Sequence, residues 1–250
     1  MIEASNLSKV FTDKKRGEVR AVDGISFKCR PGSIFALLGA NGAGKTTTLR
    51  MLATILTPTS GEATIAGYNV IDEPAKVRSK IGFLSGTTGV YGKLSPREMI
   101  EYFGRLYGLE DSVIKQRSEH LFDILNMRDF VNGRCDKLST GQKQKVSIAR
   151  SIIHEPPVMI FDEPTSGLDV MSSRTIMTFI ENCRKQGKTI IYSTHIMSEV
   201  ERLCDEIGVI HNGQIRAIGT LQQLREQTGE QNLEMVFLKL CGEGRTENGF

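Results

Sequence analysis

Residues 39–46 read GANGAGKT, and this short stretch decides much of the fold. It matches the pattern G-x-x-x-x-G-K-[ST] between an apolar run, SIFALL at 33–38, and a segment with helical spacing, KTTTLRMLATIL at 45–56. Glycines here let backbone N–H groups point inward at an anion, and the following helix adds partial positive charge. The stretch therefore predicts a buried strand, a phosphate-binding loop and a helix, in that order, rather than an ordinary glycine-rich turn.

The side chains of this loop suit a nucleoside triphosphate with its metal ion. Lys45 can reach the β- and γ-phosphates, and the hydroxyl of Thr46 can take a position on Mg²⁺. The residues predicted to contact the nucleotide here are Gly39, Asn41, Gly42, Ala43, Gly44, Lys45, Thr46 and Thr47.

A second motif, VMIFDE at 158–163, supplies acidic groups to the same site. Four apolar residues predict a buried strand, and Asp162 follows at its carboxyl end, where open α/β sheets bind ligands. Asp162 is therefore a predicted Mg²⁺ ligand, directly or through water. Glu163, one residue further on, is predicted to polarise the water that attacks the γ-phosphate.

Strand and helix patterns alternate around these two motifs. Strands at 2–11 and 20–29 are expected to pair, a helix is expected at 172–185, and residues 207–219 are typical of a hairpin with an Asn-Gly turn. Ser95 and Ser139 each stand three residues before Glu or Gln, which is typical of helix N-caps. The predicted fold class is α/β: a parallel-sheet core, an N-terminal antiparallel β part and an inserted α-helical part at about 88–155.

Composition narrows the function classes. The chain has 250 residues and a net charge of +3, which gives no support for a nucleic-acid partner. No stretch approaches the roughly 18 apolar residues of a membrane-spanning helix, and the N-terminus, MIEASNLSKVF, lacks the apolar region of a secretory signal. The five cysteines are scattered and form no CxxC, so reduced thiols are expected rather than a metal site.

A third motif adds a family resemblance. LSTGQ at 138–142 resembles the LSGGQ signature of ATP-binding cassette (ABC) proteins, FDEPTSGLD at 161–169 resembles their extended Walker B and D-loop, and STH at 193–195 resembles their H-switch. The resemblance runs to about residue 241. It is greatest to ATP-binding subunits of bacterial exporters, and within those to the sodium-extrusion type. It implies a P-loop NTPase of the ABC type in a single domain, 1–241, with a RecA-like core at about 1–87 and 156–220 and a helical subdomain at about 88–155. Residues 242–250 are expected to form a flexible tail.

The resemblance also implies a catalytic cycle and partners. The chain would bind and hydrolyse ATP with Mg²⁺, closing as a head-to-tail dimer in which each signature contacts the γ-phosphate of the other subunit. A homodimer of two copies of this chain is expected. A separate membrane permease would bind at the cytoplasmic face of the membrane, where the chain would be peripheral. Ser139 as an N-cap is expected to leave the N–H groups of residues 140–142 facing outward as the anion site.

Individual roles follow from the same resemblance. His195 would contact the γ-phosphate and hold Glu163 and the water in place. Phe11 would stack on adenine, although an edge-strand core position explains it equally well. The remaining residues implied in nucleotide contact, across the dimer or along its interface, are Ser139, Gly141, Gln142 and Asp169.

Other functions remain open at this point. The exported solute could be a drug or another molecule instead of sodium, or the chain could be a soluble ABC ATPase that does not act in transport. A nucleotide-binding regulator without turnover is a third alternative, which the presence of Glu163 and His195 disfavours.

One glycine-rich stretch, IGFLSGTTGVYG at 81–92, departs from the family pattern. It occupies the place of the Q-loop, whose glutamine ligates magnesium and senses the permease, but Gly86 stands where that glutamine is expected. Either water fills the magnesium position, or a hydroxyl of Ser85, Thr87 or Thr88 partly substitutes. The stretch is therefore expected to act as a hinge between the core and the helical part.

Overall fold

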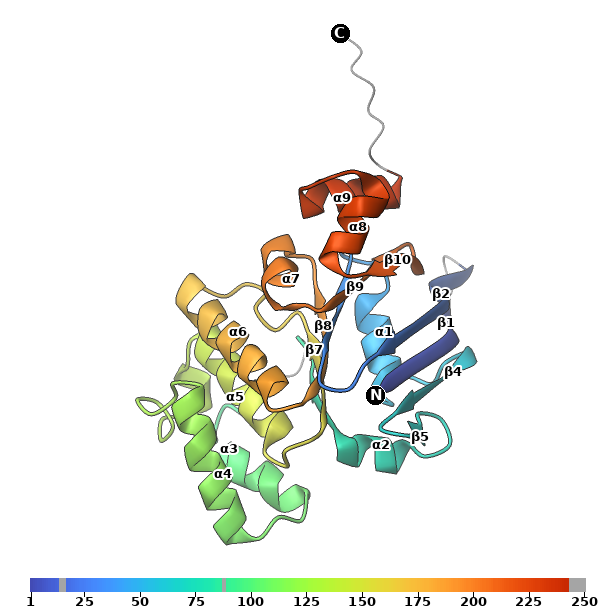
Figure 1. Ribbon diagram of the computed structural model, residues 1–250. Coiled ribbons are helices and arrows are strands. Elements are labelled where there is room, and N and C mark those ends of the chain that lie inside the picture. Colours follow the sequence, from blue (N-terminus) through green and yellow to red (C-terminus); the bar gives the residue numbers. More distant parts are fainter. Residues whose placement is uncertain (14–16, 87–88, 243–250) are drawn as a thin grey trace.

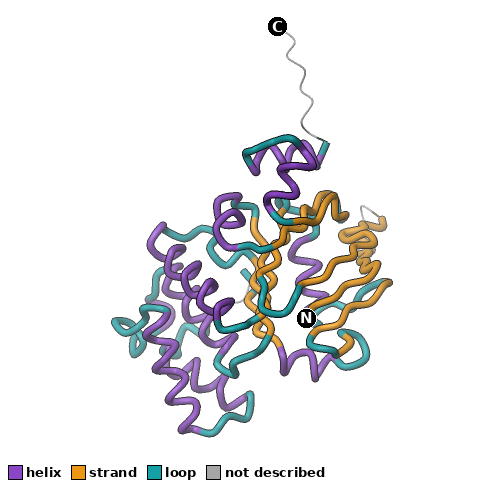
Figure 2. Tube along the Cα trace, in the orientation of Figure 1, coloured by secondary structure: helices purple, strands orange, loops and turns teal. Residues whose placement is uncertain are grey.

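The structure is a computed structural model that describes residues 1–13, 17–86 and 89–242. It contains two β-sheets, with helices packed against them (Figures 1 and 2). The six-stranded sheet has the order β10-β9-β3-β8-β7-β6 and the four-stranded sheet the order β2-β1-β4-β5. The α/β prediction is confirmed, including the N-terminal antiparallel part.

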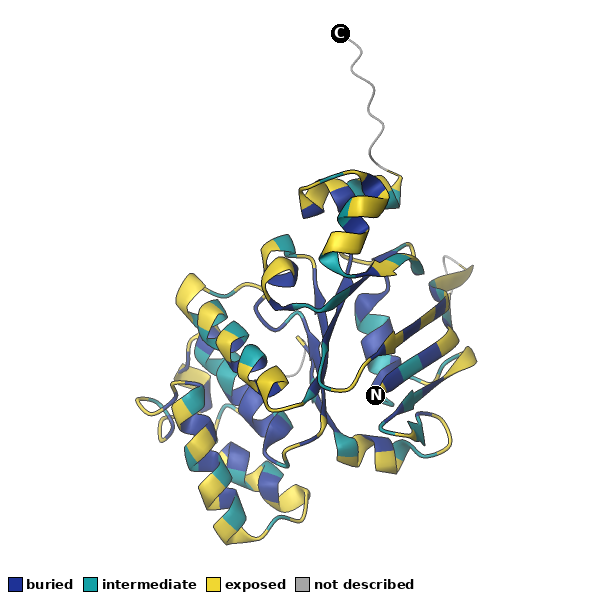
Figure 3. Cartoon of the chain, viewed as in Figure 1, coloured by how far each residue is buried: buried dark blue, intermediate teal, exposed yellow. Residues whose placement is uncertain are grey.

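The larger sheet is mostly parallel. Its strands are β3 (Ile34–Leu38), β6 (Ile81–Leu84), β7 (Val158–Asp162), β8 (Thr189–Thr194), β9 (Glu206–His211) and β10 (Gln214–Gly219). Every residue of β3, β7 and β8 is buried, as expected of parallel strands covered on both faces (Figure 3). Only β10 is antiparallel to its neighbour among these strands, and it forms the predicted hairpin with β9, in which Asn212 and Gly213 both have positive φ.

The smaller sheet is antiparallel. It consists of β1 (Ile2–Asp13), β2 (Gly17–Cys29), β4 (Ser60–Ile65) and β5 (Tyr68–Asn69). The first two strands extend further toward each other than the predicted 2–11 and 20–29, because their pairing continues to the contact between Asp13 and Gly17. Leu49, Met51 and Leu52 of α1 (Lys45–Leu52) belong to the apolar core shared by the two sheets.

Helices cover the other face of the larger sheet. In Figure 1 α3, α4, α5 and α6 lie on the side of the central strands opposite the antiparallel sheet. The helices beyond α1 are α2 (Pro74–Lys80), α3 (Pro96–Leu106), α4 (Asp111–Ile124), α5 (Thr140–Ile152), α6 (Val170–Lys185), α7 (Met197–Leu203), α8 (Leu221–Thr228) and α9 (Leu233–Cys241), with a 3₁₀ turn at Cys135–Lys137. Ser95 and Ser139 cap α3 and α5 through complete capping boxes, as predicted.

The glycine-rich stretch at 81–92 is not a loop throughout. Its first four residues form β6, which pairs in parallel with β7. Gly82 is required there by close packing rather than by a turn, because a Cβ on it would lie 2.7 Å from the carbonyl oxygen of Ser151. The loop proper therefore begins at Ser85.

Two further sequence expectations concern membrane-spanning helices and the C-terminal tail. Over the described ranges, none of the helices combines the length and the apolar character needed to cross a bilayer. The predicted tail, apart from Gly242, which ends α9, lies outside the described residues.

Candidate active site

The parallel register of the sheet brings the predicted motifs to one edge. Leu38 pairs with Thr194, and Asp162 pairs with Ser193, so the carboxyl ends of β3, β7 and β8 meet. The loop after β3 and the residues that follow β7 and β8 consequently gather at this edge, where open α/β sheets place their ligands.

Close backbone packing explains two glycines of the phosphate-binding loop. A Cβ on Gly39 would lie 2.4 Å from the carbonyl oxygen of Ile210, and one on Gly44 would lie 2.6 Å from that of Ala21. Gly44 also has φ of 107°, a conformation that side chains rarely adopt. Glycine is therefore needed at both positions because β9 and β2 pack closely against the turn.

A small pocket of about 130 Å³ lies over this loop. Of the predicted loop residues, Gly39 and Ala43 are absent from its lining: Ala43 is buried, and its N–H donates to the carbonyl of Ala40 at 3.2 Å. Ala21, which the motifs did not indicate, does line it. The complete lining is Ala21, Asn41, Gly42, Gly44, Lys45, Thr46, Thr47 and Glu163.

Lys45 is buried and surrounded by oxygen atoms. Its side chain is 4% exposed, and Nζ lies 2.7 Å from the carbonyl oxygen of Gly39, 3.1 Å from that of Ala40 and 3.1 Å from Oε1 of Glu163. A buried ammonium needs such partners to offset its lost hydration. They hold a positive charge at the base of the loop.

Asp162 receives two hydroxyl hydrogen bonds. The hydroxyl of Thr46 donates to Oδ1 at 3.1 Å, and that of Ser193 donates to the same oxygen at 2.7 Å. The structure thus brings the two predicted metal ligands into contact. Ser193 was not singled out from the sequence, although its place beside Asp162 follows once β7 and β8 are known to be neighbours.

Glu163 stands between the two other predicted catalytic residues. One carboxylate oxygen pairs with Lys45, and Oε2 lies 3.3 Å from Nδ1 of His195, whose side chain is 40% exposed. Its backbone has φ of +48°, a strained conformation that costs about 1–3 kcal/mol and persists only where surrounding bonds enforce it. The N–H of Glu163 donates to the carbonyl and hydroxyl oxygens of Ser193, both at 3.1 Å. A carboxylate held in this way, with an imidazole beside it, can accept a proton from a nearby water.

The signature residues lie next to the start of α6 instead of in the small pocket. A Cβ on Gly141 would lie 2.4 Å from Oγ of Ser172, which rules out larger residues there without movement. Asp169 caps α6 by accepting from the N–H of Ser172 at 2.8 Å, and hydrogen bonds from Ser172 lower the pKa of this carboxyl. Among the described residues that line the small pocket, none belongs to this group.

The prediction that the N–H groups of residues 140–142 all face outward is wrong at one position. The N–H of Gln142 donates to Oγ of Ser139 at 3.2 Å, and the side chain of Gln142 accepts from the N–H of Ser139 at 3.0 Å. The capping box itself uses these groups, since N-cap residues bond the third helical N–H.

The core alternative for Phe11 is wrong. This residue lies on β1 opposite Val19 and is 39% exposed, with the ammonium of Lys9 5.4 Å from its ring centroid. Stacking on adenine stays a prediction.

Gly86 is close to the acidic motif. Among the atoms of the described residues, a Cβ on Gly86 would meet only the carbonyl oxygen of Asp162 within 4 Å, at 3.9 Å. The loop that lacks the expected glutamine therefore passes beside the predicted magnesium ligand. Ser85 is buried, whereas Thr87 and Thr88 lie outside the described residues.

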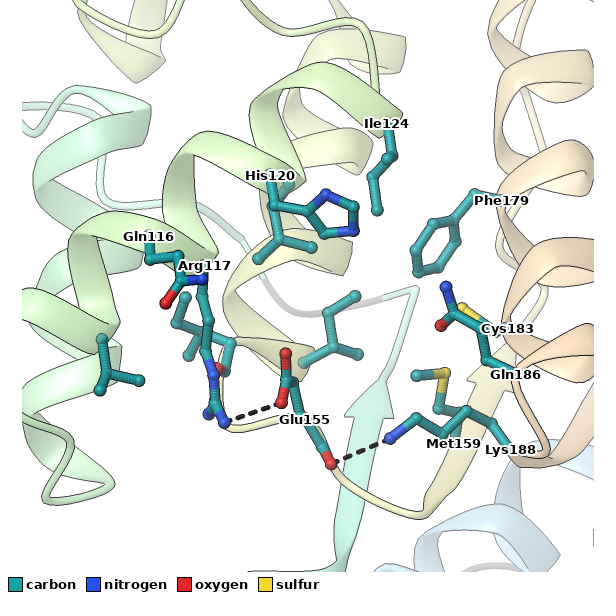
Figure 4. A pocket seen from close by; sticks show the side chains of 14 residues that line it. Gln116, Arg117, His120, Ile124, Glu155, Met159, Phe179, Cys183, Gln186 and Lys188 are labelled. Atoms are coloured by element: carbon teal, nitrogen blue, oxygen red, sulfur yellow. Dashed lines mark hydrogen bonds and ion pairs between the residues drawn. The ribbon is translucent and has the colours of Figure 1, made fainter.

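A separate cavity of about 640 Å³ opens between α4 and α6 (Figure 4). It lies beside Met159, at the amino end of β7, and a side-chain ion pair of 2.7 Å joins Arg117 to Glu155 at its rim. None of the predicted site residues lines it, so it is not the candidate site. The described residues also contain no group of three or more His, Cys, Asp or Glu arranged to hold a metal ion.

Comparisons with known proteins agree with the motifs. The family model described as ABC transporter matches residues 22–166. The ABC transporter ATP-binding protein NatA of Bacillus subtilis is 43% identical over 239 residues, covering 95% of this chain and 97% of that protein. The Nod factor export ATP-binding protein I of Ralstonia nicotianae is 37% identical, covering 84% of this chain and 66% of that protein. A solved structure described as the ATP binding subunit of an ABC transporter superposes with a TM-score of 0.86 at 30% identity, covering 96% of this chain and 99% of that one.

Proposed function

This chain belongs to the ABC transporter family as an ATP-binding subunit, and from that premise we propose that it powers export through a separate membrane permease. The observation that carries the catalytic part is the alignment of Lys45, Glu163 and His195 at one edge of the sheet. Export is supported by the similarity to a protein named for Nod factor export. Sodium ion is the first solute that we propose, on the basis of the sequence resemblance.

In the proposed reaction Glu163 accepts the proton of the attacking water. His195 orients that carboxylate and contacts the γ-phosphate, while Lys45 neutralises charge on the phosphates. Phe11 stacks on the adenine ring from the exposed face of β1. The roles of Lys45 and His195 are supported by their contacts with Glu163, at 3.1 and 3.3 Å.

The residues present also fit a magnesium ion. Thr46 and Asp162 would hold it, because hydroxyl and carboxylate oxygens are suitable ligands and these two groups are 3.1 Å apart. When bound, Mg²⁺ would offset negative charge on the phosphates. No group of three or more His, Cys, Asp or Glu among the described residues is arranged to hold a metal, which suits a metal that takes most of its ligands from phosphate and water.

We propose a second ATP-binding subunit as a partner, with two copies of this chain forming the dimer. Ser139, Gly141, Gln142 and Asp169 would then face the nucleotide of the other subunit. These residues cluster at the adjoining starts of α5 and α6, and none of them lines the small pocket of the same chain. This placement supports a role toward the nucleotide of a second subunit.

The permease would dock at a groove of about 510 Å³ between the core and the helical part. The groove is lined by three arginines and four aromatic rings, with no Asp or Glu among its described lining residues: Arg50, Arg78, Arg150, Phe83, Tyr91, Phe103 and Tyr107. This chemistry suits a short permease helix that presents apolar side chains and an acidic residue. Ser85, the first residue of the loop that passes Asp162, also lines the groove. The groove therefore lies next to this loop. We propose that residues 88–155 act as one helical subdomain in this contact, which would place the chain at the cytoplasmic face of the membrane.

Transport is tested with the chain and its permease in inverted membrane vesicles. ATP-dependent uptake of ²²Na⁺ that is lost with Glu163→Gln is the expected result. If another solute accumulates and ²²Na⁺ does not, the sodium proposal is wrong and export stands. If ATP is hydrolysed but no membrane protein co-purifies with the chain, a role outside transport replaces the proposal.

A further inference from the structure

A buried carboxylate lies near the Glu163–His195 pair without belonging to it. Glu199 is on α7 and is only 5% exposed. A carboxylate at such a depth lowers stability unless donors satisfy its oxygens. The hydrogen-bond donors around Glu199 therefore explain how this carboxylate can be buried.

Three hydroxyl groups donate to Glu199. Thr165 donates to Oε1 at 2.5 Å, while Tyr192 and Thr194 donate to Oε2 at 2.6 and 2.9 Å. Each hydroxyl has a single proton, so all three are committed to this carboxylate. The network is buried throughout.

Two of these donors adjoin the proposed catalytic residues. Thr165 is two positions after Glu163, whose carbonyl accepts from the N–H of Ser166 at 3.2 Å. Thr194 immediately precedes His195, and its hydroxyl also accepts from the N–H of Ile196 at 3.0 Å. Glu199 thus joins the segment that carries Glu163 to the residues on both sides of His195.

We infer that Glu199 is a positioning residue, which fixes the separation of Glu163 and His195 without touching the nucleotide. The inference rests on the proposed function of those two residues. The strained backbone of Glu163 needs surrounding bonds, and the bond from Thr165 to Glu199 fixes the chain two residues after it. Loss of the network should lower kcat and leave ATP binding unchanged, since the phosphate-binding loop is not part of it.

Three matched variants separate positioning from a purely structural role. Thr165→Val, Thr194→Val and Tyr192→Phe each remove one hydroxyl from Glu199. Thr165 is two positions from Glu163 and Thr194 is one position from His195, whereas Tyr192 is three positions from His195. We expect the two threonine variants to lower kcat at least tenfold with the Kd for ATP changed less than twofold. Tyr192→Phe should lower kcat less than twofold at a comparable loss of Tm. The inference would be overturned if the decrease in kcat were proportional to the decrease in Tm in all three variants. It would also be overturned if ATP affinity fell as much as kcat.

Glu199→Gln provides a direct test in the full chain, with Glu201→Gln as the control on the same helix. Glu201 is 38% exposed and pairs with Arg225, so its variant should keep the wild-type kcat. An amide cannot accept from all three hydroxyls, and Glu199→Gln should lower kcat at least fivefold. If Glu163→Gln abolishes turnover while Glu199→Gln and both threonine variants retain it, the inference alone is wrong. If Glu163→Gln itself turns over at the wild-type rate, the proposed function fails instead.

Discussion

Lys45 has its ammonium 2.7 Å from a carbonyl oxygen of the phosphate-binding loop and 3.1 Å from Glu163. Lys45→Ala removes the charge that we propose to bind phosphate, and a charged hydrogen bond contributes about 1.5–3 kcal/mol. The Kd for ATP should therefore rise at least tenfold by calorimetry. Lys28→Ala, on an exposed position of β2, is the control and should leave ATP affinity unaltered. An unaltered affinity in Lys45→Ala would exclude the assigned role of this loop.

Residues in continuous motifs were predictable from sequence, and residues brought in by strand pairing were not. The loop at 39–46 and the pair Asp162–Glu163 are local patterns with a defined chemistry. The contacts of Ser193 depend instead on β8 lying beside β7, and those of Glu199 on α7 packing against β8 and the residues after β7. Nothing in the local sequence around Ser193 or Glu199 indicates that they bond Asp162 and Thr165.

Among the elements, α3 and α5 allow a matched comparison because both begin with a serine capping box. Ser95→Ala and Ser139→Ala should each lower the free energy of unfolding by about 1 kcal/mol. Only Ser139→Ala should also lower the ATPase rate, by at least tenfold, because only α5 carries the proposed anion site for the second subunit. Equal ATPase rates in the two variants would leave Ser139 with a capping role alone.

The element β6 shows where sequence patterns mislead. Gly82 and Gly86 both suggested a loop, yet Gly82 is a strand residue whose missing side chain admits α5. Glycine indicates either a turn or close packing, and only the fold distinguishes the two.

The loop after β6 supports a prediction about coupling. Gly86→Gln restores the family's usual residue beside Asp162. The described residues leave space for it, since its Cβ would meet only one of their atoms within 4 Å, at 3.9 Å. We expect the variant to change the stimulation of ATPase activity by the permease at least twofold, while the rate of the chain alone changes less. Identical stimulated rates would show that the missing glutamine does not matter for coupling.

At the scale of the whole molecule, the two proposed sites of action lie on either side of one loop. The phosphate-binding loop and Glu163 are at the sheet edge, and the arginine-rich groove opens beside Ser85. The α/β class, the position of the inserted helices and the family were predictable, because they follow from the order of motifs along the chain. The groove could not be predicted from the sequence, since its lining residues come from four separate segments of the chain.

Dimer formation by Glu163→Gln tests the central claim most directly. Glu163→Gln keeps the shape of the side chain but removes the proton acceptor, so ATP should bind and remain intact. Light scattering with MgATP should give a dimer of twice the 27.7 kDa chain mass, with phosphate release at least 100-fold below the wild-type rate. A variant that stays monomeric with ATP bound, or that releases phosphate at the wild-type rate, would contradict the account.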